Sequence, residues 1–461
     1  MKTYLVFLLT IILGTSAIKQ TFEGYKVYKI IPRTQDEVNV VKDLQTKGIG
    51  QLWDDQVNIN YEVRIMVPPH KDDEFKNELV RGYIGAEELI SDMQRLIGDQ
   101  LQPVKRNSRN SEAFLGMTWD KYHTLDEIYK WLDDLAATYP NIVKTVVMGR
   151  SFENREIKGI IINYKPDKTD KVIGMLEGTL HAREWISPAT VSWIVKEFLT
   201  SNDPAVRSIA EDIEWHVFPV VNPDGYVYTF TDNRMWRKNR GTRNFTSCAA
   251  SGLLDDASNG VDLNRNFDFV WMSMGASSNP CLNTFAGLAP ASEPETVAIV
   301  NYVKNINSQG KFIYYYSFHS YTQLIVVPYS NVTGMDVLKA DNYGDMFEIA
   351  ARGAAKLRQR FGTIYRYGTA HDTLYVMSGT SFDWVKQETN IPVSYLIELR
   401  DLGEYGFLLP PEQIIPNNLE IMDALVEMDR VTRQMGYYSG TVPVICTLSV
   451  VTLCALVSLL M

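Results

Sequence analysis

A histidine and a glutamate three residues apart are the first residues in this chain that could do chemistry. His181 and Glu184 belong to the segment His-Ala-Arg-Glu-Trp at 181–185, between an apolar run at 172–176 and a helical pattern that starts near Ser187. A tight turn at this spacing directs both side chains at one point, and Zn2+ accepts an imidazole and a carboxylate as ligands. Because isolated pairs of this kind are common on protein surfaces, a metal site needs a third ligand.

His319 is the candidate third ligand. It follows the strand-like run 312–318, so it lies at the carboxyl end of a strand, as His181 does. A lone histidine in such a run is often a buried structural residue, but this placement favours a metal ligand. Glu398 ends another apolar run, 393–397. Four residues suited to a metal site are therefore expected at one edge of a sheet.

The elements that position these residues are strands alternating with helices. Capping residues Thr124 and Glu127 predict the start of a helix. Helical patterns also occupy 293–303 and 343–361, and the strand-like runs lie at 143–147, 159–162, 172–176, 215–221, 312–318 and 393–397. Such alternation predicts an open α/β sheet that binds its ligand at the carboxyl ends of the strands.

Residues 24–106 predict a smaller α+β unit. Strands are expected at 25–31 and 57–65, the second with alternating apolar and polar residues, and Thr34 with Glu37 predicts a helix start. A further helix is predicted at 87–101. The unit ends in Lys105, Arg106 and Arg109, which a trypsin-like protease would cut; an ordinary interdomain linker is the alternative.

Composition and the N-terminus indicate a globular, secreted protein. The chain has 461 residues, 45% of them hydrophobic, and a net charge of −10, which argues against a nucleic-acid partner. Residues 1–17 resemble a secretory signal peptide. Secretion would allow Cys248 and Cys281 to form a disulfide, and Asn244 and Asn331 begin glycosylation triplets.

The last residues form an uncharged tail. No charged residue occurs at 442–461, and small residues precede this stretch at 439–441. A GPI attachment signal, a retained membrane helix and a packed terminal segment are the three interpretations. Tethering to the cell surface is the expectation.

Six motifs resemble the zinc metallocarboxypeptidases of the A/B type. They are His-Ala-Arg-Glu-Trp at 181–185, Asn-Pro-Asp-Gly at 222–225, Arg-Met-Trp-Arg-Lys at 234–238, Gly-Val-Asp-Leu-Asn-Arg-Asn at 260–266, Phe-His-Ser-Tyr at 318–321 and Glu-Leu-Arg-Asp at 398–401. The resemblance implies a mixed eight-stranded sheet flanked by helices and preceded by a ferredoxin-like propeptide. The implied domains are a signal peptide (1–17), an activation propeptide (18–109), a catalytic domain (110–436) and the tail (437–461).

The resemblance also implies a role for each site residue. His181, Glu184 and His319 would hold one Zn2+ and leave a position open for water, and Glu398 would be the general base. Asp262 would orient His181, with loop capping as its alternative role, and an ion pair with Arg400 is the alternative for Glu398. Arg237 would polarise the scissile carbonyl, and Asn264 with Arg265 would bind the terminal carboxylate of the substrate.

Substrate preference is implied by the remaining matches. Tyr375 would close over the substrate, and Arg183, Tyr321 and Phe407 would line the outer cleft. Phe382, Met377 and Ser330 match pocket positions, and none of them is acidic, so an A-like preference for apolar C-terminal residues is expected. Asp372 keeps a B-like preference for Lys or Arg open, and a non-catalytic surface receptor on the same fold is the other alternative. The expected partners are peptide C-termini and a trypsin-like activating protease.

Overall fold

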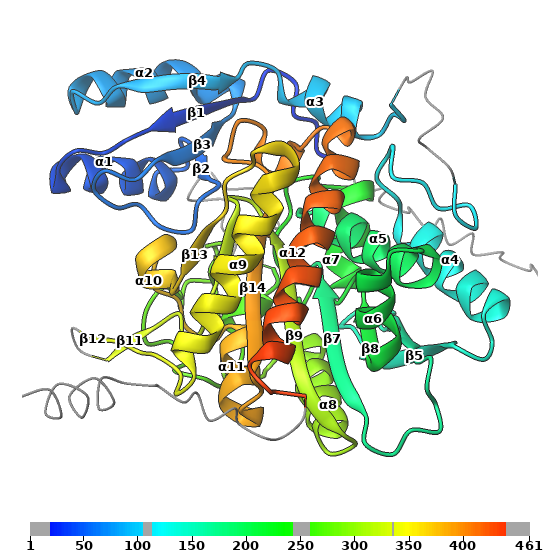
Figure 1. Cartoon of the computed structure of the whole chain (residues 1–461). Coiled ribbons are helices and arrows are strands. Elements are labelled where there is room, and N and C mark those ends of the chain that lie inside the picture. Colours follow the sequence, from blue (N-terminus) through cyan, green and yellow to red (C-terminus); the bar gives the residue numbers. More distant parts are fainter. Residues whose placement is uncertain (1–18, 105–112, 243–258, 334–335, 439–461) are drawn as a thin grey trace, which may run out of the picture.

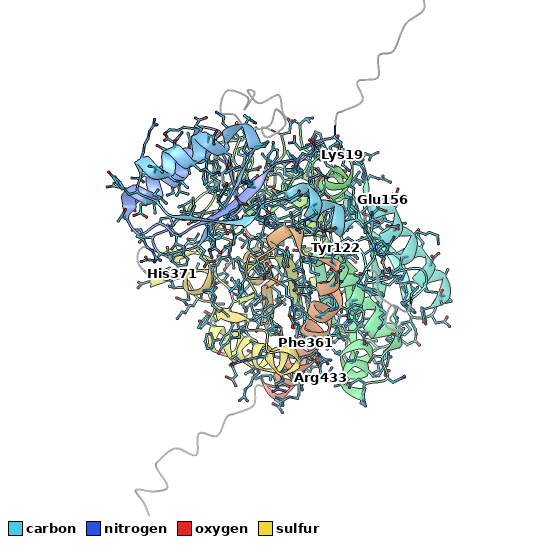
Figure 2. All side chains as sticks on the ribbon, turned by 90° about the horizontal axis from the view of Figure 1, so that it is seen from above. Lys19, Tyr122, Glu156, Phe361, His371 and Arg433 are labelled. Carbon is cyan, nitrogen blue, oxygen red and sulfur yellow. The ribbon has the colours of Figure 1, made fainter. Side chains whose placement is uncertain are left out.

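The computed structural model describes residues 19–104, 113–242, 259–333 and 336–438. The predicted signal peptide, the basic stretch around Arg106 and Arg109, Asn244, Cys248 and most of the tail fall outside these residues. Two modules make up the described chain. The first module (blue) lies across the top of the larger one in Figure 1. Lys19 and Arg433, near the two ends of the described chain, lie on opposite sides of the molecule seen from above (Figure 2).

The first module is a four-stranded antiparallel sheet with helices. Its elements are β1 (Lys26–Ile30), α1 (Gln35–Thr46), β2 (Gln51–Leu52), β3 (Val63–Val67), η1 (Pro69–Lys71), α2 (Asp72–Arg81), β4 (Ala86–Ile90) and α3 (Met93–Gln100), and the sheet order is β2-β3-β1-β4. Thr34 caps α1 as predicted, since its side chain accepts from the Glu37 N–H.

Two predictions for this module are wrong. Residues 86–90 are not helical: β4 pairs antiparallel with β1, and the helix begins only after Asp92, whose side chain caps it. Strand pairing here overrides local helix propensity. The strand predicted at 57–65 starts at Val63, and the apolar residues Ile59 and Tyr61 are 40% and 48% exposed in the preceding loop.

The larger module is built on a mixed eight-stranded sheet. Its strands are β5 (Val143–Arg150), β6 (Glu156–Ile162), β7 (Val172–Gly178), β8 (Ile213–Phe218), β9 (Lys311–Ser320), β10 (Leu324–Val326), β13 (Arg366–Gly368) and β14 (Val393–Leu399), in the order β13-β10-β14-β9-β7-β8-β6-β5. A separate hairpin pairs β11 (Val332–Thr333) with β12 (Asp336–Val337). Each strand predicted from the sequence overlaps an observed one, which confirms the predicted fold class.

Helices cover both faces of this sheet. They are α4 (Leu125–Thr138), α5 (Ile186–Thr200), α6 (Pro204–Asp212), α7 (Pro223–Thr231), α8 (Pro294–Asn307), α9 (Tyr343–Phe361), α10 (Ala370–Thr373), α11 (Ser381–Thr389) and α12 (Ile414–Gln434), with short turns η3 (Leu263–Arg265), η4 (Gly406–Leu408) and η5 (Pro411–Gln413). One apolar cluster joins α4, α5, α9 and α12 to the sheet, and a second joins α8 and α11 to it. The sheet is thus buried on both faces.

The four central strands position the site. β14, β9, β7 and β8 are neighbours and run parallel, so their carboxyl ends lie at one edge. Glu398 pairs in register with His319 across β14 and β9. No helix among the described residues is long and apolar enough to cross a lipid bilayer.

Candidate active site

The candidate metal ligands come from two adjacent strands. His181 and Glu184 lie in the turn between β7 and α5, and His319 is near the end of β9. Ser187 holds this turn against the neighbouring strand, because its hydroxyl accepts from the Thr179 N–H (3.0 Å) and donates to the Phe318 carbonyl (2.7 Å). The helix starts at Ile186, so Ser187 lies inside the first turn rather than capping it.

The three side chains converge as predicted. Nδ1 of His181 lies 2.8 Å from Oε1 of Glu184, and Nδ1 of His319 lies 3.0 Å from Oε2 of the same carboxylate and 3.0 Å from Nδ1 of His181. All three residues are buried, and each offers one ligand atom within 4.8 Å of the others. They form a site that could bind one metal ion.

The outer nitrogens of both imidazoles are held by oxygen atoms. Nε2 of His181 lies 3.1 Å from Oδ1 of Asp262, and Nε2 of His319 lies 3.0 Å from Oγ of Ser317. With Nε2 protonated and donating to these oxygens, each Nδ1 is left as a lone-pair ligand. Two such imidazoles and a carboxylate are a donor set that fits Zn2+.

Asp262 serves two purposes. Its Oδ1 faces His181 and also accepts from the Asn264 N–H (3.0 Å), so both roles considered for it from the sequence are present. Its Oδ2 accepts from Nη2 of Arg237 at 2.9 Å. Burial raises the pKa of this carboxyl, but Arg237 and His181 outweigh burial and hold it well below its usual range. Asp262 is therefore an ionised carboxylate that contacts both the candidate metal ligand His181 and Arg237.

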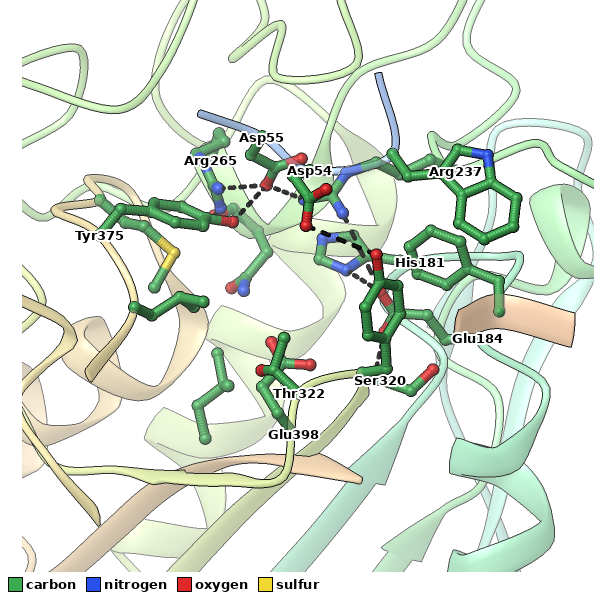
Figure 3. Close-up of a pocket in the computed structure, with 17 residues that line it drawn as sticks. Asp54, Asp55, His181, Glu184, Arg237, Arg265, Ser320, Thr322, Tyr375 and Glu398 are labelled. Carbon is green, nitrogen blue, oxygen red and sulfur yellow. Dashed lines mark hydrogen bonds and ion pairs between the residues drawn. The ribbon is translucent and has the colours of Figure 1, made fainter. Parts of the chain in front are cut away.

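Glu398 lies in the same cleft without a partner. It lines the pocket with His181, Glu184 and Arg237, and its buried Oε2 has no hydrogen-bond partner among the described residues. In Figure 3 no dashed line reaches it. Arg400 pairs instead with Glu420 at 2.6 Å, so the alternative ion pair with Glu398 is absent. Burial and the charge of Glu184 raise the pKa of Glu398 well above its ordinary value.

A residue of the first module occupies the middle of the cleft. Oδ2 of Asp55 accepts from Nη2 of Arg237 (2.8 Å), Nη2 of Arg265 (2.7 Å) and the hydroxyl of Tyr375 (2.8 Å), as Figure 3 shows. Burial raises the pKa of Asp55, but the two guanidinium groups outweigh it and the net shift is downward. No sequence pattern indicates a role for Asp55 in the cleft, because its partners lie 182 or more residues away along the chain.

The outer cleft also contacts the first module. The guanidinium of Arg183 stacks on the ring of Phe407 at 3.9 Å and donates to the Trp53 carbonyl at 3.0 Å. Tyr321 packs edge-on against the same phenyl ring at 4.9 Å. These residues lie together as expected, although Arg183 is buried beneath the cleft rather than lining it.

Of the three residues predicted to line the specificity pocket, only Met377 lines the cleft. Met377 lines the cleft, where Leu374 and Leu396 add two apolar side chains that sequence reasoning missed, and Asn264 lies nearby. Phe382 is fully buried in the apolar cluster that contains Met377 and Leu396, and it does not line the cleft. Ser330 is also buried away from the lining, where its N–H donates to Asp383 (2.9 Å).

Two modification predictions meet different outcomes. Asn331 is buried and its amide donates to Oγ of Ser273 (2.9 Å) and to the Met377 carbonyl (2.8 Å), which argues against glycosylation there. Cys281 is disulfide-bonded, and its predicted partner Cys248 lies outside the described residues.

Comparison with known proteins decides the family. The zinc carboxypeptidase family matches residues 128–424, and the carboxypeptidase activation peptide family matches residues 28–100. The chain belongs to the zinc carboxypeptidase family. It is a hydrolase whose metal is zinc, and its first module is an activation peptide of the kind found in zymogens.

Individual relatives include both A- and B-named enzymes. The chain is similar to zinc carboxypeptidase A 1 of Anopheles gambiae, with 36% identity over 90% of this chain and 92% of that protein. It is 39% identical to carboxypeptidase B of Astacus astacus over 67% of this chain and 96% of that protein. The carboxypeptidase A structure from Helicoverpa armigera superposes with a TM-score of 0.75 and 27% identity, over 90% of this chain and 98% of that one.

Proposed function

We propose that this zinc carboxypeptidase releases apolar residues from the C-termini of peptides and proteins once its activation peptide is removed. The observation that carries the proposal is the position of Asp55. Its carboxylate is bound by Arg237, Arg265 and Tyr375 beside the candidate metal ligands. A peptide that ends in a free carboxylate presents the same chemical group to the same donors.

The chain supplies the groups that peptide hydrolysis needs. His181, Glu184 and His319 would hold the zinc ion, which when bound activates water and polarises a carbonyl. Glu398, whose buried Oε2 has no hydrogen-bond partner among the described residues, would take the proton of the attacking water and pass it to the leaving amine. Its raised pKa suits proton transfer near neutral pH.

Arg237 and Arg265 would bind different groups of the substrate. Arg237, fixed by Asp262 at 2.9 Å, would stabilise the oxyanion that develops on the scissile carbonyl. Arg265 and Asn264 would bind the terminal carboxylate, and Tyr375 would close over it. Tyr321 and Phe407 would contact the preceding residues of the peptide, and Arg183 would support the ring of Phe407, on which its guanidinium stacks.

Apolar specificity rests on three apolar side chains of the cleft. Leu374, Met377 and Leu396 line it, and Phe382 belongs to the apolar cluster that contains Met377 and Leu396. Asp383 is buried and accepts from the Ser330 N–H, away from the cleft. Asp372 is exposed and bonded to Thr369. Neither aspartate lines the cleft, and three apolar side chains there favour apolar over basic side chains of the substrate.

Maturation and location complete the proposal. We infer a signal peptide at 1–17, an activation propeptide at 18–109 that a trypsin-like protease releases by cutting near Arg106 or Arg109, and a catalytic domain at 110–436. The apolar tail at 437–461 would tether the secreted enzyme to the cell surface through a GPI anchor or a membrane segment.

Trypsin activation of the proenzyme, followed by turnover of peptides ending in Leu, Phe or Lys, tests this function. Release of Leu or Phe that a zinc chelator abolishes would support it. Faster release of Lys would instead assign a B-like preference, and an inactive but zinc-loaded protein would favour the receptor alternative.

A further inference from the structure

Glu177, on β7 and outside the cleft, is a buried carboxylate with one unpartnered oxygen. The residue is fully buried, and its Oε2 has no hydrogen-bond partner among the described residues. Oγ of Ser381 donates to its Oε1 at 3.0 Å. Burial raises the pKa of Glu177, and the hydrogen bond from Ser381 opposes the rise. A carboxylate is costly to bury in this way, so its position needs an explanation.

A second serine hydroxyl reaches a candidate metal ligand. Oγ of Ser317 lies 3.0 Å from Nε2 of His319, while Nδ1 of the same ring faces Glu184. If Nδ1 binds the metal, Nε2 carries the proton and donates it to Ser317. Oγ of Ser317 in turn lies 3.5 Å from Oγ of Ser381, which connects it to Glu177.

Ser381 also holds a side chain that the proposed function assigns to substrate binding. The backbone N–H of Ser381 donates to Oδ1 of Asn264 at 2.9 Å. This contact fixes the orientation of the amide, so that its NH2 group is the end left for the cleft. The Ser381 hydroxyl bonds Glu177 and lies 3.5 Å from the Ser317 hydroxyl.

We propose that Glu177 is a positioning residue, which through Ser381 and Ser317 orients the zinc ligand His319 and through Ser381 also fixes the start of α11 against Asn264. The inference rests on the proposed function, which assigns His319 to zinc and Asn264 to the substrate carboxylate. Carboxylates that orient a metal-binding histidine directly typically contribute 10- to 100-fold to metal affinity. Here two serines stand between the carboxylate and the histidine.

Zinc affinity of the full-length proenzyme tests the proposal without any turnover measurement. Glu177→Gln and Ser317→Ala are compared with the parent protein in competition with a zinc chelator. We expect each variant to weaken zinc binding by about tenfold or more. The double variant should bind zinc no less tightly than the single variant with the lower affinity, because both residues act through the same chain of hydrogen bonds to His319.

Ser192→Ala is the matched control. Ser192, in α5, is likewise a buried serine, but its hydroxyl donates to the Ala189 carbonyl and accepts from Nε1 of Trp119, away from the site. Zinc affinity within threefold of the parent in both Glu177→Gln and Ser317→Ala would overturn the proposal. So would additive effects in the double variant. Ser317→Ala keeps the test decisive if Glu177→Gln does not fold, and a parent protein that binds no zinc would refute the proposed function instead.

Discussion

Oδ2 of Asp55 lies 2.7 Å from Nη2 of Arg265, across the interface between the activation peptide and the catalytic module. The same oxygen lies 2.8 Å from Nη2 of Arg237. A single propeptide carboxylate thus neutralises both cations that the proposed mechanism assigns to substrate. The contact covers the site and occupies its cations. Removal of the activation peptide therefore takes this carboxylate away from both guanidinium groups, while Arg237 keeps its contact with Asp262.

Replacing Asp55 should therefore raise the activity of the uncleaved proenzyme. Asp55→Asn removes the charge that pairs with Arg237 and Arg265 while keeping the size of the side chain. Breaking a buried ion pair across an interface typically costs about 2–5 kcal/mol. We expect uncleaved Asp55→Asn proenzyme to hydrolyse a small peptide substrate at least tenfold faster than the uncleaved parent. The exposed propeptide residue Asp73 provides the control, Asp73→Asn, which should leave the basal rate unchanged. Equal basal rates in all three proteins would contradict this role.

Recognition of the terminal carboxylate should depend on Arg265. The activated parent enzyme should discriminate strongly between a peptide with a free C-terminus and the same peptide as its C-terminal amide. Arg265→Ala should lower kcat/KM for the free acid by about 100-fold or more, because a charge-assisted bidentate contact is lost, and should change hydrolysis of the amide little. If Arg265→Ala affects both peptides equally, Arg265 has another role.

The size of the apolar pocket should be set by Met377. Met377→Ala removes a side chain that lines the cleft in front of Phe382. We expect the ratio of kcat/KM for C-terminal Phe over Leu to rise by about tenfold, as expected when a pocket gains room for a larger side chain. Met346→Ala, a buried core substitution on α9, controls for general destabilisation and should leave the ratio unchanged.

Buried Asp383 should make stability depend on pH. Burial raises its pKa to about 7, so the folded protein holds this proton at pH values where the unfolded chain, with a value near 3.8, has lost it. Because the folded pKa is the higher one, the contribution of Asp383 to the unfolding free energy should be largest below about pH 4 and should fall as the pH rises towards 7. Asp383→Asn should flatten this slope in chemical denaturation, whereas the exposed Asp126→Asn should not. An unchanged slope in Asp383→Asn would assign the dependence to other groups, such as Glu295, whose pKa is also raised to about 7.

The sequence predicted the central sheet and the metal ligands because both depend on local patterns. Apolar runs that end in His319 or Glu398 are visible along the chain, and parallel strands bring such ends together. Residues 87–90 were mispredicted as helical because pairing with β1 decides their conformation. Asp55 and Leu396 could not be assigned to the cleft, since only tertiary packing brings them there.

The proposed mechanism requires a general base, Glu398, beside a three-residue zinc site. Glu398→Gln keeps the size of the side chain and leaves His181, Glu184 and His319 intact. Zinc content and turnover of a peptide ending in Leu should be measured on the same trypsin-activated sample. We expect one zinc ion per chain and a kcat reduced by about 1,000-fold, within the range that general base catalysis supplies. A fully zinc-loaded Glu398→Gln enzyme with kcat within tenfold of the parent would contradict the account.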